Sequence, residues 1–353
     1  MVPKRILVTG ASGYIGGTVL KALLNSPSKA IQESEISVLV RTEEQARVLK
    51  ERFQVATIVF NGFDDTETIT NVASKHDVVV HTASGFATGC ARALITGLAK
   101  RKQAMGYQVQ YIHTSGTSNI GNSPYLGLYD EEPSGVFTDD NPKKTVAALR
   151  RMNAAFSYEQ RETDLAVIET GIEQGVKTYI LMSADIYGEG EGEFNRLTIQ
   201  VPKMIRSAYR EGQVWVIGDG SGVWNHVHVH DLGLLYEVFV ARLLEGVVIP
   251  HGEQGIFFTE NGEHSWNEVA NGIATTGFEL GKLKTKEVRT ISLAEATAEL
   301  GWGSKMWTES GFASTARTSG TLARSLGWKP TRPKEDFLEH FRDEWNAVIA
   351  KGF

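Results

Sequence analysis

The stretch Arg5-Ile-Leu-Val-Thr-Gly-Ala-Ser-Gly-Tyr-Ile-Gly16 decides the fold of this chain. Its apolar run at 6–8 is typical of a short strand that is buried on both faces of a parallel sheet. Gly10, Gly13 and Gly16 follow, and the segment 18–24 after them has helical periodicity. Glycines permit a sharp turn and a close approach of a phosphate, which the N-terminus of the next helix attracts. The position between strand and helix therefore favours a dinucleotide site over a turn without a ligand.

Three further segments are expected to complete this site. Small side chains at the end of a strand predicted over 77–84 let a dinucleotide lie close to the backbone. Asp64, in the loop after a strand predicted over 56–60, is expected near the adenine. The predicted contacts of the turn and of the strand end are Gly10, Ser12, Gly13, Tyr14, Ile15, Gly16, Thr82, Ala83 and Ser84.

Arg41 indicates which dinucleotide binds. It ends a strand predicted over 36–40, where a dinucleotide fold meets the adenosine ribose. An acidic residue would bind the ribose 2′-OH of NAD, whereas the forked cation of Arg41 suits a 2′-phosphate. The sequence therefore favours NADP over NAD. An arginine that only faces solvent at a strand end is the alternative.

Composition excludes several classes of protein. The chain has 353 residues and a net charge of −6, with 36 Lys and Arg against 42 Asp and Glu and no basic tract. This argues against a nucleic acid or an anionic membrane as a partner. Cys90 is the one cysteine, which rules out an internal disulfide and favours a reducing compartment. No apolar run is long enough to span a bilayer, and the first strand begins close to Met1. We therefore expect a cytoplasmic protein.

Short β-rich runs alternate with helical segments along the first half of the chain. This alternation is typical of an α/β fold with a doubly wound parallel sheet of the Rossmann type. We predict a Rossmann domain at 1–185 with 226–258, and a smaller mixed C-terminal substrate domain at 186–225 with 259–353. A polar loop at 119–144 is expected to line the site, and a long helical stretch is predicted over 145–171.

Several motifs resemble the extended (or atypical) short-chain dehydrogenase/reductase family, especially its nucleoside-diphosphate-sugar epimerase-like and dihydroflavonol-reductase-like branches. The resemblance covers nearly the whole length and implies a Rossmann domain, a small-molecule substrate and compatibility with a homodimer. The matching segments are Thr9-Gly-Ala-Ser-Gly-Tyr-Ile-Gly16, His81-Thr-Ala-Ser84, Tyr111-Ile-His-Thr-Ser115, Ile186-Tyr-Gly188, Gly218-Asp-Gly220, Val227-His-Val-His-Asp231 and Ser325-Leu-Gly-Trp-Lys-Pro330.

The catalytic residues depart from this family's pattern. The family uses a Ser or Thr at the end of the fifth strand and a Tyr-x-x-x-Lys pair on the next long helix. No tyrosine in this chain has a lysine four residues later. Four residues after Tyr158, where the family has lysine, stands Glu162, which is expected to raise the pKa of the tyrosine. The hydroxyl position of the pattern falls at Gly116. Ser115, Thr117 and Tyr158 are therefore the predicted catalytic residues.

Other readings of these polar residues stay open. Tyr158 could be an ordinary tyrosine on a helix surface. His113, Asp185 and Tyr187 are other candidates for acid–base work near the strand ends. Alternating histidines at 226, 228 and 230 have a spacing that can hold zinc. Because the resembling family carries a related segment without metal, no metal site is predicted, and Asp231 is expected to cap a helix that starts near 232.

Three functions are compatible with this sequence. The first is an NADP-dependent oxidoreductase that acts on a carbonyl or alcohol of a small organic molecule. The second is an epimerase, dehydratase or isomerase without net redox change. The third is a catalytically inactive, NADP-binding regulatory protein, since the tyrosine–lysine pair is missing while the glycine turn is intact.

Overall fold

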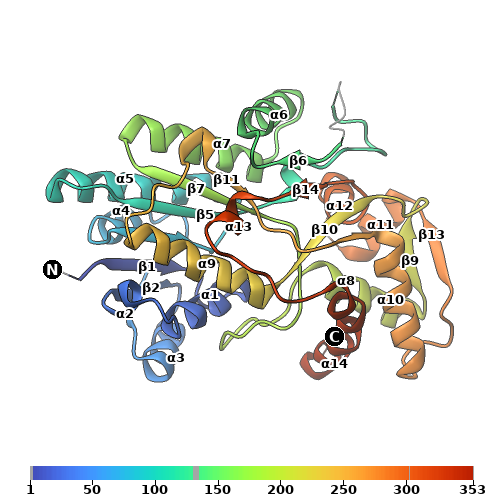
Figure 1. Cartoon of the computed structure of the whole chain (residues 1–353). Coiled ribbons are helices and arrows are strands. Elements are labelled where there is room, and N and C mark those ends of the chain that lie inside the picture. The colour runs from blue at the N-terminus through green and yellow to red at the C-terminus, as the bar shows by residue number, and fades with distance from the viewer. Residues whose placement is uncertain (1–2, 130–134, 302, 353) are drawn as a thin grey trace.

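A parallel sheet of seven strands forms the centre of the computed structural model, which describes residues 3–129, 135–301 and 303–352. The strand order is β11-β7-β5-β4-β1-β2-β3, so the chain winds outward from β1 in both directions (Figure 1). This confirms the predicted Rossmann-type fold. The strands are β1 Arg5–Thr9, β2 Glu35–Val40, β3 Ala56–Val59, β4 Val78–His81, β5 Gln110–Gly116, β7 Lys177–Ser183 and β11 Ile256–Phe258.

Helices cover both faces of the sheet. Neighbouring residues of a strand point to opposite faces, so Ile6 and Val8 join one apolar core while Leu7 joins the other. The first core contains α1 Tyr14–Leu24, α2 Lys29–Gln32, α3 Glu43–Phe53 and α9 Val229–Leu244. The second contains α4 Thr66–Ala73, α5 Thr88–Met105, α6 Pro142–Ala155 and α7 Glu159–Gln174.

A third apolar core lies beyond the carboxyl ends of the strands, on the right of Figure 1. A small sheet in the order β12-β10-β8 stands between this part and the central sheet, which fits the smaller mixed domain of the prediction. The exact domain boundaries stay a prediction. The elements here are β8 Asp185–Tyr187, α8 Gln200–Glu211, β9 Val214–Ile217, β10 Val223–His228, β12 Glu263–Ser265, α10 Trp266–Glu279, β13 Val288–Ile291, α11 Leu293–Leu300, α12 Lys305–Phe312 and α14 Lys334–Lys351.

The predicted helical stretch over 145–171 is wrong in one respect. It is two helices, α6 and α7, separated by an extended residue, Phe156, at which α6 ends. The Asn153 side chain accepts a hydrogen bond from the Tyr158 N–H at 3.2 Å, and Tyr158 is the N-cap residue of α7. The break places the Tyr158 side chain at the start of a helix rather than on its surface.

The loop at 119–144 is more ordered than its composition indicates. It begins in a short helix, η1 Thr117–Ile120, and contains β6 Phe137–Thr138, which pairs with β14 Thr318–Ser319. Residues 130–134 of this loop lie outside the described residues.

The prediction for Asp231 is also wrong. Helix α9 begins at Val229, and its cap is His228, whose Nδ1 accepts the N–H of His230 at 3.1 Å. The buried Asp231 carboxylate instead accepts hydrogen bonds from Thr331 and from the N–H of Arg332, at 3.0–3.1 Å. It therefore anchors the chain that leads into α14.

None of the helices in the described part of the chain combines the length and the apolar character that a bilayer crossing needs.

Candidate active site

The glycine turn joins β1 to α1 in the way the sequence predicts. Gly10 has a φ of +78°, and the Gly13 N–H donates to its carbonyl at 2.8 Å. A Cβ on Gly16 would stand 2.1 Å from the Gly10 oxygen and 2.4 Å from Thr82 Oγ1. Helix α1 has no side-chain cap and no acidic residue in its first turn. Its N-terminal N–H groups are therefore open to an anionic ligand, which fits a dinucleotide pyrophosphate.

The end of β4 lies against this turn. A Cβ on Gly10 would be 2.7 Å from the Ala83 backbone, and the Thr82 hydroxyl donates to the Thr9 carbonyl at 2.6 Å. Thr82, Ala83 and Ser84 are all partly exposed. The structure thus brings the two predicted groups of cofactor residues together.

Side chains within the turn have other partners. The buried Tyr14 phenol donates to the Gly188 carbonyl at 2.6 Å, and Ile15 packs against the first core. The Ser12 carbonyl accepts the N–H of Asn195 at 3.4 Å. Tyr14 and Ile15 therefore offer a cofactor their backbone groups rather than their side chains.

Arg41 and Asp64 are both exposed, at the ends of β2 and β3. The Arg41 N–H donates to Gln45 Oε1 at 3.0 Å, and Thr42 caps α3. Because β2 is the strand next to β1, Arg41 lies on the same sheet edge as the glycine turn.

Tyr158 reaches the same edge at the end of β5. Its side chain is 5% exposed, and its hydroxyl lies 3.2 Å from Ser118 Oγ, which donates to Gln160 Oε1 at 2.8 Å. The Gln160 amide lies beside Gly85 and Gly116, since its Nε2 is 3.0 and 3.3 Å from the positions of a Cβ on those residues. Ser118 and Gln160 are not predicted from the sequence, because no motif marks them and their approach to Tyr158 depends on the break between α6 and α7.

The two predicted hydroxyls point elsewhere. Ser115 Oγ donates to Asp164 Oδ2 at 2.7 Å, and the Asn119 amide donates to the same oxygen at 2.6 Å. Thr117 Oγ1 is buried and has no hydrogen-bond partner among residues 3–129, 135–301 and 303–352. Burial raises the pKa of Asp164 to about 7. The structure therefore places Ser115 in a buried network, and it places Ser118 beside Tyr158.

The pKa of Tyr158 is raised, as expected, but the cause is burial rather than Glu162. Burial raises its pKa to about 12, while the hydrogen bond to Ser118 and the charge of Arg161 lower it. The Arg161 guanidinium is buried, lies 5.5 Å from the Tyr158 ring centroid and donates to the Asn119 carbonyl. Glu162 accepts a hydrogen bond from Ser157 on the exposed side. The raised pKa is thus an effect of desolvation and not of Glu162.

The other acid–base candidates lie away from this group. His113 is buried, and its ring stacks on that of His81 with 5.5 Å between the ring centroids. Burial lowers the pKa of His113 well below the usual value. Asp185 lies 3.7 Å from His264, and Tyr187 packs edge-on against His226. Of the three alternating histidines, His230 lies in α9 and contacts Glu191 at 2.8 Å. The described residues contain no group of three side chains that could hold a metal ion.

Aromatic side chains surround the approach to Tyr158. Phe86 is 46% exposed, and its ring centroid lies 6.0 Å from that of Tyr158. Trp307 of α12 is 38% exposed and lies 6.2 Å from Phe86. The loop after β4 and the C-terminal part of the chain thus contribute a row of aromatic rings beside the Tyr158 ring.

Comparison with known proteins identifies the family. Residues 6–247 match the family described as the NAD dependent epimerase/dehydratase family. The chain is 30% identical over 346 residues to a protein of Acremonium sp named oxidase ucsJ, covering 94% of both chains. The chain therefore belongs to this family of enzymes, which use a nicotinamide dinucleotide.

Solved structures show the same fold at low identity. A dTDP-glucose 4,6-dehydratase of Streptomyces venezuelae, determined with NAD and TYD bound, matches with a TM-score of 0.68 at 17% identity over 98% of both chains. A UDP-N-acetylglucosamine 4-epimerase of Methanobrevibacter ruminantium matches with a TM-score of 0.62 at 14% identity over 100% of both chains. These two likenesses extend to the fold alone.

Proposed function

We propose that this chain is an NADP-dependent oxidoreductase that reduces a carbonyl group of a small organic molecule with an apolar or aromatic face. The observation that carries this proposal is the Tyr158 hydroxyl, which lies buried 3.2 Å from Ser118 Oγ at the end of β5. Parallel strands present their carboxyl ends at one edge, so this hydroxyl shares an edge with the glycine turn.

The residues at this edge fit a bound dinucleotide. The open N-terminus of α1 would hold the pyrophosphate, and Arg41 would pair with a 2′-phosphate. Thr82, Ala83 and Ser84 would leave room for the cofactor beside the strand end. When bound, the reduced nicotinamide supplies a hydride.

Tyr158 is suited to donate a proton rather than to accept one. A phenol with a pKa of about 12 is protonated at neutral pH, so it can deliver its proton to a carbonyl oxygen that gains charge during reduction. Ser118 holds the phenol in place, and the positive charge of Arg161 stabilises the phenolate that remains. Arg161 therefore supplies part of the positive charge that the missing lysine would provide.

The aromatic rings beside Tyr158 support a substrate class. Phe86 and Trp307 offer ring faces and no charged group, so they favour a flat, apolar substrate carrying a carbonyl. We further propose a cytoplasmic enzyme that forms a homodimer; light scattering on the purified chain tests the second point.

NADPH consumption with a panel of aromatic and aliphatic aldehydes and ketones tests the proposal. We expect turnover of aromatic carbonyl compounds that requires NADPH. Binding of NADPH without turnover of any member of the panel would favour a regulatory protein instead.

A second candidate is an epimerase or dehydratase without net redox change. It is favoured by the matched family, whose description names epimerases and dehydratases. Conversion of a nucleotide sugar with unchanged nicotinamide absorbance, in the presence of NAD, would support this candidate.

A further inference from the structure

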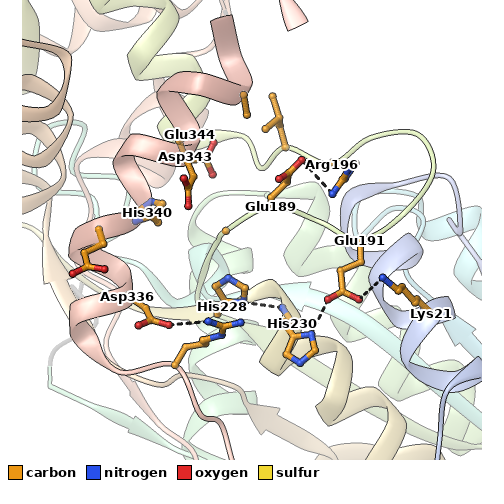
Figure 2. Close-up of a pocket in the computed structure, with 15 residues that line it drawn as sticks. Lys21, Glu189, Glu191, Arg196, His228, His230, Asp336, His340, Asp343 and Glu344 are labelled. Atoms are coloured by element: carbon orange, nitrogen blue, oxygen red, sulfur yellow. Dashed lines mark hydrogen bonds and ion pairs between the residues drawn. The ribbon is translucent and has the colours of Figure 1, made fainter. Parts of the chain in front are cut away.

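A cavity lies away from the Tyr158 group, between α1, the first turn of α9, the segment 188–197 and α14 (Figure 2). Its volume is about 550 Å³. None of its lining residues belongs to the Tyr158 group or to the end of β4. The cavity is therefore a separate feature of the fold.

The cations of this cavity are each matched by an acid of the same cavity. Figure 2 shows the Glu191 carboxylate between Lys21 and His230, at 3.4 and 2.8 Å. Arg196 forms an ion pair with Glu189 at 3.3 Å, and Arg332 forms one with Asp336 at 3.1 Å. These contacts neutralise the three strong bases of the lining.

Three carboxyl groups of α14 remain. Glu339, Asp343 and Glu344 form no ion pair with a Lys or Arg in the described part of the chain. The two imidazoles beside them do not supply a charge, since burial lowers the pKa of His228 and of His340 to about 4. The cavity therefore has an excess of acidic groups over bases.

The Glu344 carboxyl group is buried in the wall of this cavity. Its side chain is 3% exposed, and neither carboxyl oxygen has a hydrogen-bond partner among the described residues. His340 Nε2 is also buried without a partner. Buried polar groups are normally hydrogen-bonded, because a buried group without a partner destabilises the fold. Two such groups at one wall therefore indicate that a ligand supplies the missing partners.

We propose that this cavity binds a small organic cation, whose ammonium or guanidinium group is held by the carboxylates of Glu344 and Asp343. An ammonium group offers several donors and no acceptor, which matches a wall of unpaired carboxyl oxygens. The volume is far larger than a metal ion, and Leu197 and Ala347 give the ligand an apolar surface for its carbon chain.

Burial and the neighbouring Asp185 and Glu189 raise the pKa of Glu344 to about 8, whereas Arg206 lowers it. A bound cation would stabilise the ionised carboxylate, so binding is expected to release a proton near neutral pH. This site does not depend on the proposed reductase activity.

Isothermal titration calorimetry of the full chain with n-butylammonium and putrescine, at low ionic strength, tests the site. We expect saturable binding that Glu344→Gln and Asp343→Asn each weaken by about tenfold or more, the loss of one charge-assisted contact. Glu335→Gln, on the exposed face of the same helix, is the matched control and should bind as the unaltered chain does.

Glu344→Gln keeps the shape of a side chain that is largely protonated at neutral pH, so its fold should be retained. Asp343 is exposed, which makes Asp343→Asn an independent test should the first variant misfold. No saturable binding, equal binding of neutral n-butanol, or unchanged affinity in Asp343→Asn would overturn the proposal. Displacement of the amines by a stoichiometric zinc ion would overturn it as well.

Discussion

At the scale of single residues, the proposed chemistry depends on one phenol in an apolar setting. Removing Tyr158 from water disfavours its ionised form, and one hydrogen bond and one guanidinium only partly offset that effect. The group is therefore an acid that is held in its protonated form across the physiological range. It suits the delivery of a proton to an oxygen, not the abstraction of one.

Replacing Tyr158 with phenylalanine removes the proton donor and leaves the ring in place. We expect kcat for carbonyl reduction to fall by about 100-fold to 10,000-fold, the contribution typical of a general acid. Ser118→Ala should lower kcat by about fivefold, since one neutral hydrogen bond contributes about 1 kcal/mol. Tyr209→Phe, on the surface of α8, is the control, and full activity in Tyr158→Phe would remove this residue from the mechanism.

Replacing Arg41 with alanine tests the identity of the dinucleotide. The loss of a charge-assisted contact with a 2′-phosphate should weaken NADPH binding by about tenfold to a hundredfold. NADH has no such phosphate, so its affinity should stay the same, and fluorescence titration measures both. An equal loss for the two cofactors would contradict the preference for NADP.

Tyr158 could be predicted from the chain because it lies in the segment where the family's order places the catalytic tyrosine. Ser118 could not, because its role depends on the break between α6 and α7, which the side chain of Asn153 helps to fix. The inward orientation of Ser115 depends on Asp164, 49 residues further on, and such a pairing has no local signal.

At the scale of elements, the turn between β1 and α1 is the best-determined part of the molecule. Gly10 and Gly16 pack against the end of β4 so closely that neither position has room for a Cβ. The strands of the sheet could be predicted because their apolar runs are buried on both faces. The role of Asp231 could not be predicted, because its partner Thr331 lies 100 residues later in the chain. The sequence therefore predicts Asp231 as the helix cap, whereas the cap of α9 is His228.

Adding one methyl group to Gly16 should disrupt this turn. Its Cβ would meet backbone 2.1 Å away, so Gly16→Ala should abolish stabilisation of the chain by NADPH in a thermal-shift assay. Gly89→Ala is the matched control, because nothing lies within 4 Å of its Cβ and it lies in helix α5. This variant should bind NADPH normally and gain up to about 0.5–1 kcal/mol of stability.

At the scale of the whole molecule, buried carboxyl groups couple folding to pH. Burial raises the pKa of Asp164 and Asp185 to about 7 and contributes to raising that of Glu344 to about 8. Each of these groups keeps its proton in the folded chain at a pH where the unfolded chain has lost it. Their stabilising contribution is therefore present in full at acid pH and is lost as pH rises through the folded-state pKa values.

The buried histidines act in the opposite direction. Burial lowers the pKa of His81, His228 and His340 to about 4, so stability gains from them as pH rises from about 4 to the value of about 6.5 for an unfolded histidine. Between pH 6.5 and 8, the change of the free energy of unfolding with pH therefore comes from the carboxyl groups and not from these histidines.

Urea unfolding across that window measures the carboxyl effect. We expect the free energy of unfolding to decrease as pH rises, by up to about 1.4 kcal/mol per pH unit for each such group. Glu344→Gln should make the decrease shallower, while Glu335→Gln should leave it unchanged. A stability that increases with pH over this window would contradict the assignment.

Hydride transfer from the cofactor can be followed with NADPH in which both hydrogens of nicotinamide C4 are replaced by deuterium. With an aromatic ketone as substrate, we expect an alcohol that carries one deuterium on its carbinol carbon, formed at a rate that Tyr158→Phe lowers by about 100-fold or more. Substrate converted to product without the label, at unchanged nicotinamide absorbance and at the same rate in Tyr158→Phe, would contradict the proposed carbonyl reduction.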